Sequence, residues 1–351
     1  MKKFNLKEDY TPRGFVFVPT YNCTAFCKHC NNDFKNHNLN QKMEIKKAIE
    51  LLYEGKEMGL NSIQITGGEI TMYPEFMLSL IPHAKKLAIR VNKPPTNAYI
   101  AKDKNKAAEF FKNLKEINYT SGFRLSIDPY HQEKIPLNWV ADFIVEYSKF
   151  FKLSSLTIGS SYYDKEKIFA LYTDLILLLK NYFKSVGLIK EKKAIIIDGY
   201  KIKYGVWKPT RPSWQPLFDY EVELKEIINT MHCLGPKGVG YLWIELDFKV
   251  RICSCNGNNF LDYLIIGDLK KDELIDIINR AKQNPVFKIL ANYGPAGLRD
   301  FLNFNEIIIS PEKKYTFMCE LCNEILANKN YIVKIIENYN KYFLNEKIAK
   351  L

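Results

Sequence analysis

Short apolar runs alternate with longer segments of helical periodicity through the first two hundred residues of the chain. Runs rich in Val, Ile and Phe predict strands at 15–18, 62–66, 88–91, 123–128, 155–159 and 193–197. Apolar residues spaced three or four apart predict helices over 41–58, 73–87, 105–117, 137–151 and 165–183. Strands that alternate with helices predict an α/β fold with a parallel sheet, and the active site of such a sheet lies at the C-terminal edge of its strands.

This alternation stops in the segment 205–216, which contains Trp207, Trp214 and three prolines and therefore predicts a linker. A different pattern follows it. Residues 240–246 and 249–252 predict two strands joined by a turn at Asp247, and the chain ends in a helical segment. We therefore expect two domains, 1–205 and a small α+β domain over 206–351.

Composition and charge narrow the class of protein. Hydrophobic residues make up 47% of the 351 positions, yet no run of 18 apolar residues occurs and the N-terminus lacks a signal peptide. We therefore expect a cytoplasmic enzyme with no membrane partner. The net charge of +12 comes from lysines interspersed with acidic residues, without an Arg-rich block, so nucleic acid is not an expected partner. A solvated lysine surface explains the charge, and steering of an acidic peptide is the alternative.

The most informative motif is Cys23-x3-Cys27-x2-Cys30, directly after the first predicted strand. Three thiolates at this spacing can ligate three irons of a [4Fe–4S] cube and leave the fourth iron without a protein ligand. The alternative is a zinc site completed by His29 or His37, but Cys-x3-Cys is an unusual opening for zinc.

Two later strands also carry candidate ligand-binding residues. Adjacent glycines after the strand 62–66 let the backbone approach a ligand closely and leave N–H groups to bind it. Ser126 and Asp128 fall on one face of the strand 123–128 and can both point at a ligand above the sheet. The segment from Asp128 to His131 has a plain turn as its alternative.

Together these motifs resemble those of the radical S-adenosylmethionine (SAM) enzymes over residues 14–205, which implies a partial (β/α)6 barrel. In that family SAM binds the open iron and is cleaved reductively to a 5′-deoxyadenosyl radical, with flavodoxin or ferredoxin as the reductant. The Gly-Gly-Glu segment resembles the family's Gly-Gly-Glu-Pro motif, with Ile70 in place of Pro, and Thr96-Asn97-Ala98 resembles Thr-Asn-Gly. The resemblance implies SAM contacts from His29, Gly67, Gly68, Glu69, Asn97, Ser126 and Asp128, with Glu69 at the amino group.

Five more cysteines lie in the second predicted domain, at 233, 253, 255, 319 and 322. A cysteine before a hairpin, others at its end and a distant Cys-x2-Cys resemble the SPASM or twitch extension, which holds an auxiliary [4Fe–4S] cluster. The resemblance implies ligation by Cys233, Cys253, Cys319 and Cys322. A four-cysteine zinc site is the alternative that the spacing alone permits.

The same pattern resembles the radical SAM peptide epimerases, in which a cysteine thiol returns hydrogen to the Cα radical of a peptide. That resemblance extends to His29 and His131. Four of the five cysteines suffice for a cube, so one is spare, and Cys255 is the candidate hydrogen donor. The sequence departs from the family here, because Ser254 stands where the epimerases carry their donor cysteine.

Three classes of function therefore stay open. The first is a peptide-modifying radical SAM enzyme that epimerises or crosslinks its substrate. The second is a radical SAM dehydrogenase for a small molecule, and the third is a zinc-stabilised binding protein without catalysis. Only about fourteen residues precede the first predicted strand, so we expect no separate leader-binding domain.

Overall fold

The structure is a computed structural model of the chain. It describes residues 12–30, 38–161, 165–207, 222–223, 240–253, 262–309, 314–315 and 318–348. The chain divides into two compact units. We call Val16–Glu57 with Asn61–Pro209 the barrel unit, and Met1–Phe15 with Met58–Leu60 and Thr210–Leu351 the C-terminal unit.

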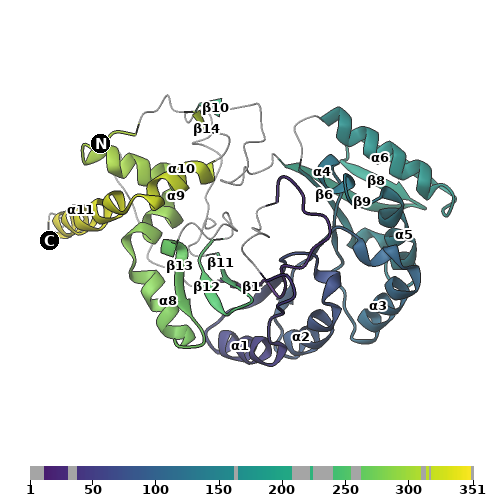
Figure 1. Cartoon of the computed structure of the whole chain (residues 1–351), viewed down its shortest axis with the longest axis horizontal. Helices are drawn as coiled ribbons and strands as arrows, with labels where there is room; N and C mark the ends of the chain where they lie inside the picture. The colour runs from purple at the N-terminus through teal and green to yellow at the C-terminus, as the bar shows by residue number, and fades with distance from the viewer. Residues whose placement is uncertain are drawn as a thin grey trace. The chain divides into compact units, whose positions relative to one another are not determined.

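Parallel strands form the framework of the barrel unit (Figure 1). They are β1 (Gly14–Phe17), β2 (Ser62–Ile65), β3 (Arg90–Val91), β4 (Pro95–Thr96), β5 (Arg124–Ser126) and β6 (Thr157–Ser161). Strand β1 neighbours β2, which pairs in parallel with β3, while β4, β5 and β6 are parallel to one another. Strands β3 and β4 are two halves of one segment, so this segment joins the two groups of strands.

Five long helices connect these strands and lie along their outer side (Figure 1). They are α1 (Ile45–Glu57), α2 (Pro74–Lys86), α3 (Lys104–Glu116), α5 (Leu137–Ser148) and α6 (Lys165–Leu179). Helix α1 packs on α2, and α5 packs on both α3 and α6. Periodicity predicted all five helices, with boundaries within a few residues of those observed.

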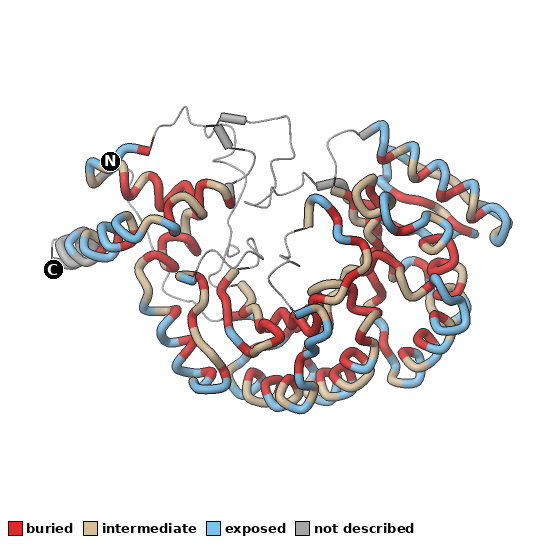
Figure 2. Tube along the Cα trace, in the orientation of Figure 1, coloured by how far each residue is buried: buried red, intermediate tan, exposed pale blue. Residues whose placement is uncertain are grey.

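Aromatic side chains fill the space between the strands and helices α3 and α5. Phe123, beside β5, has no exposed surface and lies within 6.3 Å, between ring centres, of Phe111, Phe143 and Tyr147. In Figure 2 the strands of this unit are largely buried, whereas the outer sides of the helices are exposed. The apolar stripes of the helices therefore form the core with one face of the strands.

The sixth predicted strand has a different direction from the expected one. Residues 194–197 form β8 (Ala194–Ile197), which is antiparallel to β7 (Val186–Ile189) and β9 (Tyr200–Trp207). The strand parallel to β6 is β9. Asp198 and Gly199 both have positive φ, +45° and +82°, and this tight turn reverses the chain. Because β9 includes residues 205–207, the predicted start of the linker was also wrong.

The C-terminal unit contains an antiparallel sheet of β11 (Tyr241–Ile244), β12 (Lys249–Arg251) and β13 (Ile265–Asp268). The predicted hairpin is thus confirmed, and a buried ion pair between Glu245 and Arg251 (3.3 Å) joins its strands. The short strands β10 (Val222–Glu223) and β14 (Lys314–Tyr315) pair with each other. The unit also contains helices α8 (Leu274–Gln283), α9 (Pro285–Phe304), α10 (Met318–Ala327) and α11 (Lys329–Ile348). Helices α8, α10 and α11 each pack against α9.

The chain therefore has the predicted α/β fold, with a partial barrel of parallel strands and a smaller α+β unit. Within the described residues, no helix combines the length and the apolar character that crossing a membrane requires.

Candidate functional site

The cysteine loop follows β1 at the C-terminal edge of the strands. Cys23 and Cys27 are buried and Cys30 is half-buried. Phe26 turns the chain between them with a positive φ of 42°, and the Cys30 N–H donates to the Cys27 carbonyl at 2.9 Å. The loop therefore folds back on itself and keeps its three thiols within one short segment.

The electrostatics of this loop favour a bound cation. Burial raises the pKa of Cys23 to about 11, and the charge of Glu69 acts in the same direction. Burial also raises the pKa of Cys27 far above its usual range, and Cys30, Cys23 and Asp128 add to the shift. Ionising all three thiols in this buried loop therefore costs free energy, unless a bound metal compensates their negative charge. The donor set fits a [4Fe–4S] cube bound through three cysteines.

The Gly-Gly turn after β2 contacts the segment that leads into the cysteine loop. The Gly68 N–H donates to the Thr20 carbonyl at 2.8 Å, and the Glu69 N–H donates to the Asn22 carbonyl at 2.7 Å. A Cβ atom on Gly68 would lie 2.2 Å from the Asn22 oxygen. Only glycine permits this close approach, so Gly68 fixes where the first cysteine lies.

Glu69 is buried and binds protein groups with both carboxylate oxygens. Oε1 accepts from the Thr71 N–H (3.0 Å), the Thr71 hydroxyl (2.7 Å) and the Thr96 hydroxyl (2.7 Å). Oε2 accepts from the Asn97 N–H at 2.7 Å. Glu69 therefore ties the end of β2 to the end of β4, a role that sequence motifs did not predict.

Asn97 connects this network to the cysteine loop. Its Nδ2 group donates to Cys23 Sγ at 3.7 Å, and its Oδ1 accepts from the Tyr99 N–H at 2.9 Å. An amide that donates to a cysteine sulfur stabilises the thiolate form. Asn97 is thus positioned to orient and stabilise the sulfur of Cys23.

A cavity of about 140 Å³ lies next to the cysteines, roughly ten times the space that one water needs. Its lining comprises Cys23, Ala25, Cys27, His29, Cys30, Thr66, Gly67, Gly68, Glu69, Pro95, Thr96, Asn97, Ser126 and His131. Six of the seven predicted SAM-contacting residues are in this set. The exception is Asp128.

Asp128 has 1% exposure and is hydrogen-bonded to protein groups. It caps the short helix α4 (Pro129–Gln132) by accepting from the His131 N–H, and its carboxylate lies 2.9 Å from His131 Nδ1. The Ser161 N–H also donates to it at 3.2 Å. The carboxylate therefore orients His131, and it is His131 that lines the cavity. In the sequence, this pair can be recognised as a helix-capping Asp that is followed three residues later by a His.

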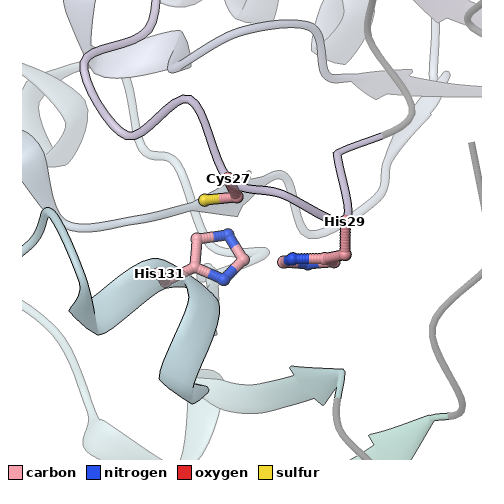
Figure 3. A group of neighbouring side chains, drawn as sticks. All are labelled: Cys27, His29 and His131. Carbon is pink, nitrogen blue, oxygen red and sulfur yellow. The ribbon is translucent and has the colours of Figure 1, made fainter. Parts of the chain in front are cut away.

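His131, His29 and Cys27 approach one another at the cavity, as Figure 3 shows. One potential ligand atom from each lies within 4.8 Å of the others. Burial lowers the pKa of His29 to about 4, with His131 adding to the effect and Asp128 opposing it. His29 Nδ1 is buried and has no hydrogen-bond partner among the described residues. A neutral imidazole with an unused nitrogen is suited to bind a ligand in this cavity.

The same trio is a mixed sulfur and nitrogen set of the kind that also binds zinc. A cube would use Cys23, Cys27 and Cys30, whereas zinc would use one thiolate and two imidazoles. His37, the other histidine considered from sequence, lies outside the described residues.

In the C-terminal unit, Cys319 and Cys322 lie three residues apart in the first turn and a half of α10, and both are buried. This spacing places them on one face of the helix, and the helix N-terminus favours thiolates. Cys253, half-buried, follows β12. Cys233, Ser254 and Cys255 lie outside the described residues.

Comparisons with known proteins assign the segment that contains this site. Residues 17–147 match the sequence model of the Radical SAM superfamily, so this segment is a radical SAM domain. No curated protein sequence matches the chain.

Solved structures of other proteins are similar to most of the chain, and two of them are described here. Native anSMEcpe with bound AdoMet and Cp18Cys peptide has 13% identity and a TM-score of 0.52, over 96% of this chain and 98% of its own. Streptococcus suis SuiB bound to precursor peptide SuiA has 15% identity and a TM-score of 0.45, over 90% of this chain and 76% of its own. The likeness to anSMEcpe supports the fold described above.

Proposed function

We propose that this radical SAM domain holds a [4Fe–4S] cluster on Cys23, Cys27 and Cys30, cleaves SAM beside it, and abstracts hydrogen from a peptide substrate. The observation that carries the proposal is the convergence of the cysteine loop, the Gly-Gly-Glu turn and Asn97 on one cavity. Electrons come from a reductant such as flavodoxin or ferredoxin.

When bound, such a cluster would supply the electron for the reductive cleavage of SAM to methionine and a 5′-deoxyadenosyl radical. The chain itself has three tasks. The cysteines hold the cluster, and Asn97 donates a hydrogen bond to the sulfur of Cys23. Gly67, Gly68, Ser126 and His29 line the cavity, and in this proposal they contact SAM. Glu69 fixes the segment that carries Asn97, which adds a structural role to its proposed contact with the SAM amino group.

The peptide substrate and the reaction rest on the C-terminal cysteines. Four of them, Cys233, Cys253, Cys319 and Cys322, ligate a second [4Fe–4S] cluster in this proposal, and the similar anSMEcpe structure holds a peptide. In an epimerisation, the radical takes a Cα hydrogen from an L-residue, and the thiol of Cys255 returns a hydrogen atom to the opposite face. The resulting thiyl radical is reduced by one electron and one proton from the reductant and solvent.

One observation favours a second reaction. Ser254 separates Cys253 from Cys255, and an O–H bond is too strong to donate hydrogen to a Cα radical. If Cys255 serves instead as a cluster ligand, the substrate radical would pass one electron to the auxiliary cluster, and a nucleophilic side chain of the peptide would lose its proton and bond to that carbon, which forms the crosslink.

Anaerobic reconstitution tests the clusters. We expect about eight irons per chain, four for each cube. The variants Cys23→Ala, Cys27→Ala and Cys30→Ala should each lose about half of the iron and all formation of 5′-deoxyadenosine, measured by chromatography. Cys319→Ala should lose the other half, which makes it the matched control for iron content.

Zinc gives a different set of results. One zinc per chain, lost in His131→Ala and retained in Cys30→Ala, would identify the trio of Cys27, His29 and His131 as a zinc site. That result, together with no 5′-deoxyadenosine from wild-type protein, would contradict the proposed function.

A further inference from the structure

Strand β7 lies at the edge of a sheet in the barrel unit. The order of the strands in this sheet is β4-β5-β6-β9-β8-β7, so β8 is the one strand that β7 neighbours in the described part of the chain. The two strands are antiparallel and pair over the whole length of β7, with Val186 opposite Ile197 and Ile189 opposite Ala194. The other side of β7 faces no strand of the described residues.

The hydrogen bonds between β7 and β8 show which backbone groups of β7 point toward the free edge. Directly before β7, the Asp198 N–H donates to the Ser185 carbonyl at 2.8 Å, so these two opposite residues form a hydrogen-bonded pair. Hydrogen-bonded pairs alternate with non-bonded pairs along antiparallel strands. Gly187 therefore bonds β8, whereas the N–H and C=O groups of Val186 and Leu188 point away from it. Among the described residues, none forms a hydrogen bond with these outward groups.

Strand β7 lacks three features that protect the sheet edges of many proteins. Its four residues, Val-Gly-Leu-Ile, include no charged residue and no proline, and its register with β8 is continuous. A Cβ atom on Gly187 would meet nothing within 4 Å, so the surface beside this residue is also open. An edge of this kind can pair with an extended chain through backbone hydrogen bonds.

The charges next to this edge indicate what kind of chain it accepts. The segment 184–193 carries four lysines and one acidic residue, a net charge of +3, and all five side chains are exposed. They are Lys184, Lys190, Glu191, Lys192 and Lys193. Two copies of the protein that paired through β7 would bring their lysines together, and like charges across a strand pair are destabilising. An acidic chain would instead be attracted.

We propose that β7 binds an acidic, extended segment of the peptide substrate as an additional strand and so holds the substrate while another of its residues reaches the cavity. This inference rests on the proposed function, because it names the class of peptide and how the protein holds it. The outward N–H and C=O groups of Val186 and Leu188 would bond the peptide backbone. The lysines would select for acidic side chains.

The separation between β7 and the cavity fits a single peptide. The added strand would lie five strand positions from β5, which is about 24 Å along the sheet. By strand register, Leu188 is three residues, or about 10 Å, nearer to the N-terminal ends of the parallel strands than Ser126, which lines the cavity. The combined distance is about 26 Å, which about eight extended residues span.

Peptide binding to the reconstituted full-length protein with SAM tests this site. The probes are fluorescein-labelled Gly-Glu-Val-Thr-Val-Glu-Gly amide and Gly-Glu-Pro-Pro-Pro-Glu-Gly amide, compared by fluorescence anisotropy. The two peptides have the same charge, but the prolines remove the N–H groups that a strand donates. We expect the Val-Thr-Val peptide to bind at least about tenfold more tightly.

Hydrogen–deuterium exchange locates the binding site. In the fragment 185–190, addition of the Val-Thr-Val peptide should slow exchange at the amides of Val186 and Leu188, because these N–H groups point to the free edge. The Pro-Pro-Pro peptide should leave exchange in this fragment unchanged. This measurement needs only the wild-type protein.

Two substitutions at one position separate the edge from the side chain. Leu188→Pro removes the outward N–H without removing a bond to β8, so it should abolish the preference for the Val-Thr-Val peptide. Leu188→Ala is the matched control, since it shortens the same side chain but keeps the N–H, and it should retain the preference. Circular dichroism checks that both variants fold.

Three results would overturn the proposal. Equal binding of the two peptides to the wild type would show attraction by charge alone, and unchanged exchange in the fragment 185–190 would place the peptide elsewhere. Slow exchange at Val186 and Leu188 before any peptide is added, together with a dimeric mass by light scattering, would show that a second copy covers β7. Formation of 5′-deoxyadenosine by the wild type reports separately on the proposed function.

Discussion

At the scale of single residues, Glu69 shows how a motif can name a residue without giving its whole role. The sequence assigned it to the SAM amino group by resemblance. The structure adds four hydrogen bonds from Thr71, Thr96 and Asn97, two of which come from a segment 27 or 28 residues away. Contacts at such separation leave no local pattern, and so they could not be predicted.

Replacing Glu69 with Gln should destabilise the protein by about 1–3 kcal/mol. The substitution presents an NH2 group either to the Asn97 N–H or to the three donors around Oε1, and either orientation leaves buried donors without an acceptor. Chemical unfolding of the anaerobic protein measures the effect, with exposed Glu109→Gln on α3 as the control. Equal stability of the two variants would show that the network is weak. The expectation that Glu69→Ala weakens SAM binding stays a prediction.

Asp128 was predicted to contact SAM, but it is the neighbouring His131 that lines the cavity. Burial raises its pKa, but the hydrogen bonds from His131 and the charge of His131 outweigh this, so the pKa lies below its usual 3.8. The folded protein then holds the ionised form more strongly than the unfolded chain does. Its contribution to stability is complete above about pH 4 and is lost as the pH falls through the folded pKa.

We therefore expect Asp128→Asn to lower the stability of the protein at neutral pH by about 1–3 kcal/mol and to flatten its loss below pH 4. Acid unfolding of the cluster-free chain, followed by circular dichroism, measures both. The exposed Asp174→Asn on α6 should retain the wild-type profile. If Asp128→Asn lost stability below pH 4 as steeply as the wild type does, the interaction between residue 128 and His131 would not depend on an ionised carboxylate.

At the scale of elements, the periodicity of the sequence predicted the helices well because their apolar stripes are long. The direction of a short strand was harder to predict. The run 194–197 is apolar and buried in either strand direction, so its composition could not distinguish parallel from antiparallel pairing. The deciding feature is the two-residue turn at Asp198 and Gly199, whose positive φ values reverse the chain. The Asp198 carboxylate accepts a hydrogen bond from the Ser185 N–H, and the Asp198 N–H donates to the Ser185 carbonyl.

This turn gives a clean test, because a Cβ atom at Gly199 would have no neighbour within 4 Å. Any effect of Gly199→Ala must then come from the backbone. We expect a loss of about 1–2 kcal/mol, the cost of a left-handed conformation for alanine. Gly187 in β7 also has an open Cβ position but no positive φ, so Gly187→Ala should be neutral or stabilising by up to about 1 kcal/mol. Equal effects in thermal unfolding would contradict the proposed turn geometry.

At the scale of the whole molecule, the two units differ in how far sequence reasoning could reach. In the barrel unit the cysteine spacing, the Gly-Gly pair and Asn97 were recognisable, and the fold brings them to one cavity. In the C-terminal unit the cysteines come from a strand end, a helix and segments outside the described residues. Their spacing alone suits either a cube or zinc, so it leaves the metal open.

Replacement of Cys255 tests which reaction of the proposed function takes place. Four cysteines complete a cube, so one of the five in this half of the chain is spare, and a spare thiol near the substrate has an S–H bond weak enough to quench a Cα radical. Cys255→Ala should then retain about eight irons and SAM cleavage, yet stop product formation and leave the substrate radical visible by electron paramagnetic resonance. Cys253→Ala is the control and should lose the auxiliary cluster.

Solvent deuterium supplies the complementary measurement. Because thiols exchange with solvent, the wild-type enzyme in D2O should place one deuterium at the Cα of a D-residue, detected by mass spectrometry and chiral analysis. Loss of half of the iron in Cys255→Ala would instead make Cys255 a cluster ligand. A product without deuterium would exclude a thiol donor, and the substrate radical would then lose its electron to the auxiliary cluster, as the crosslinking alternative requires.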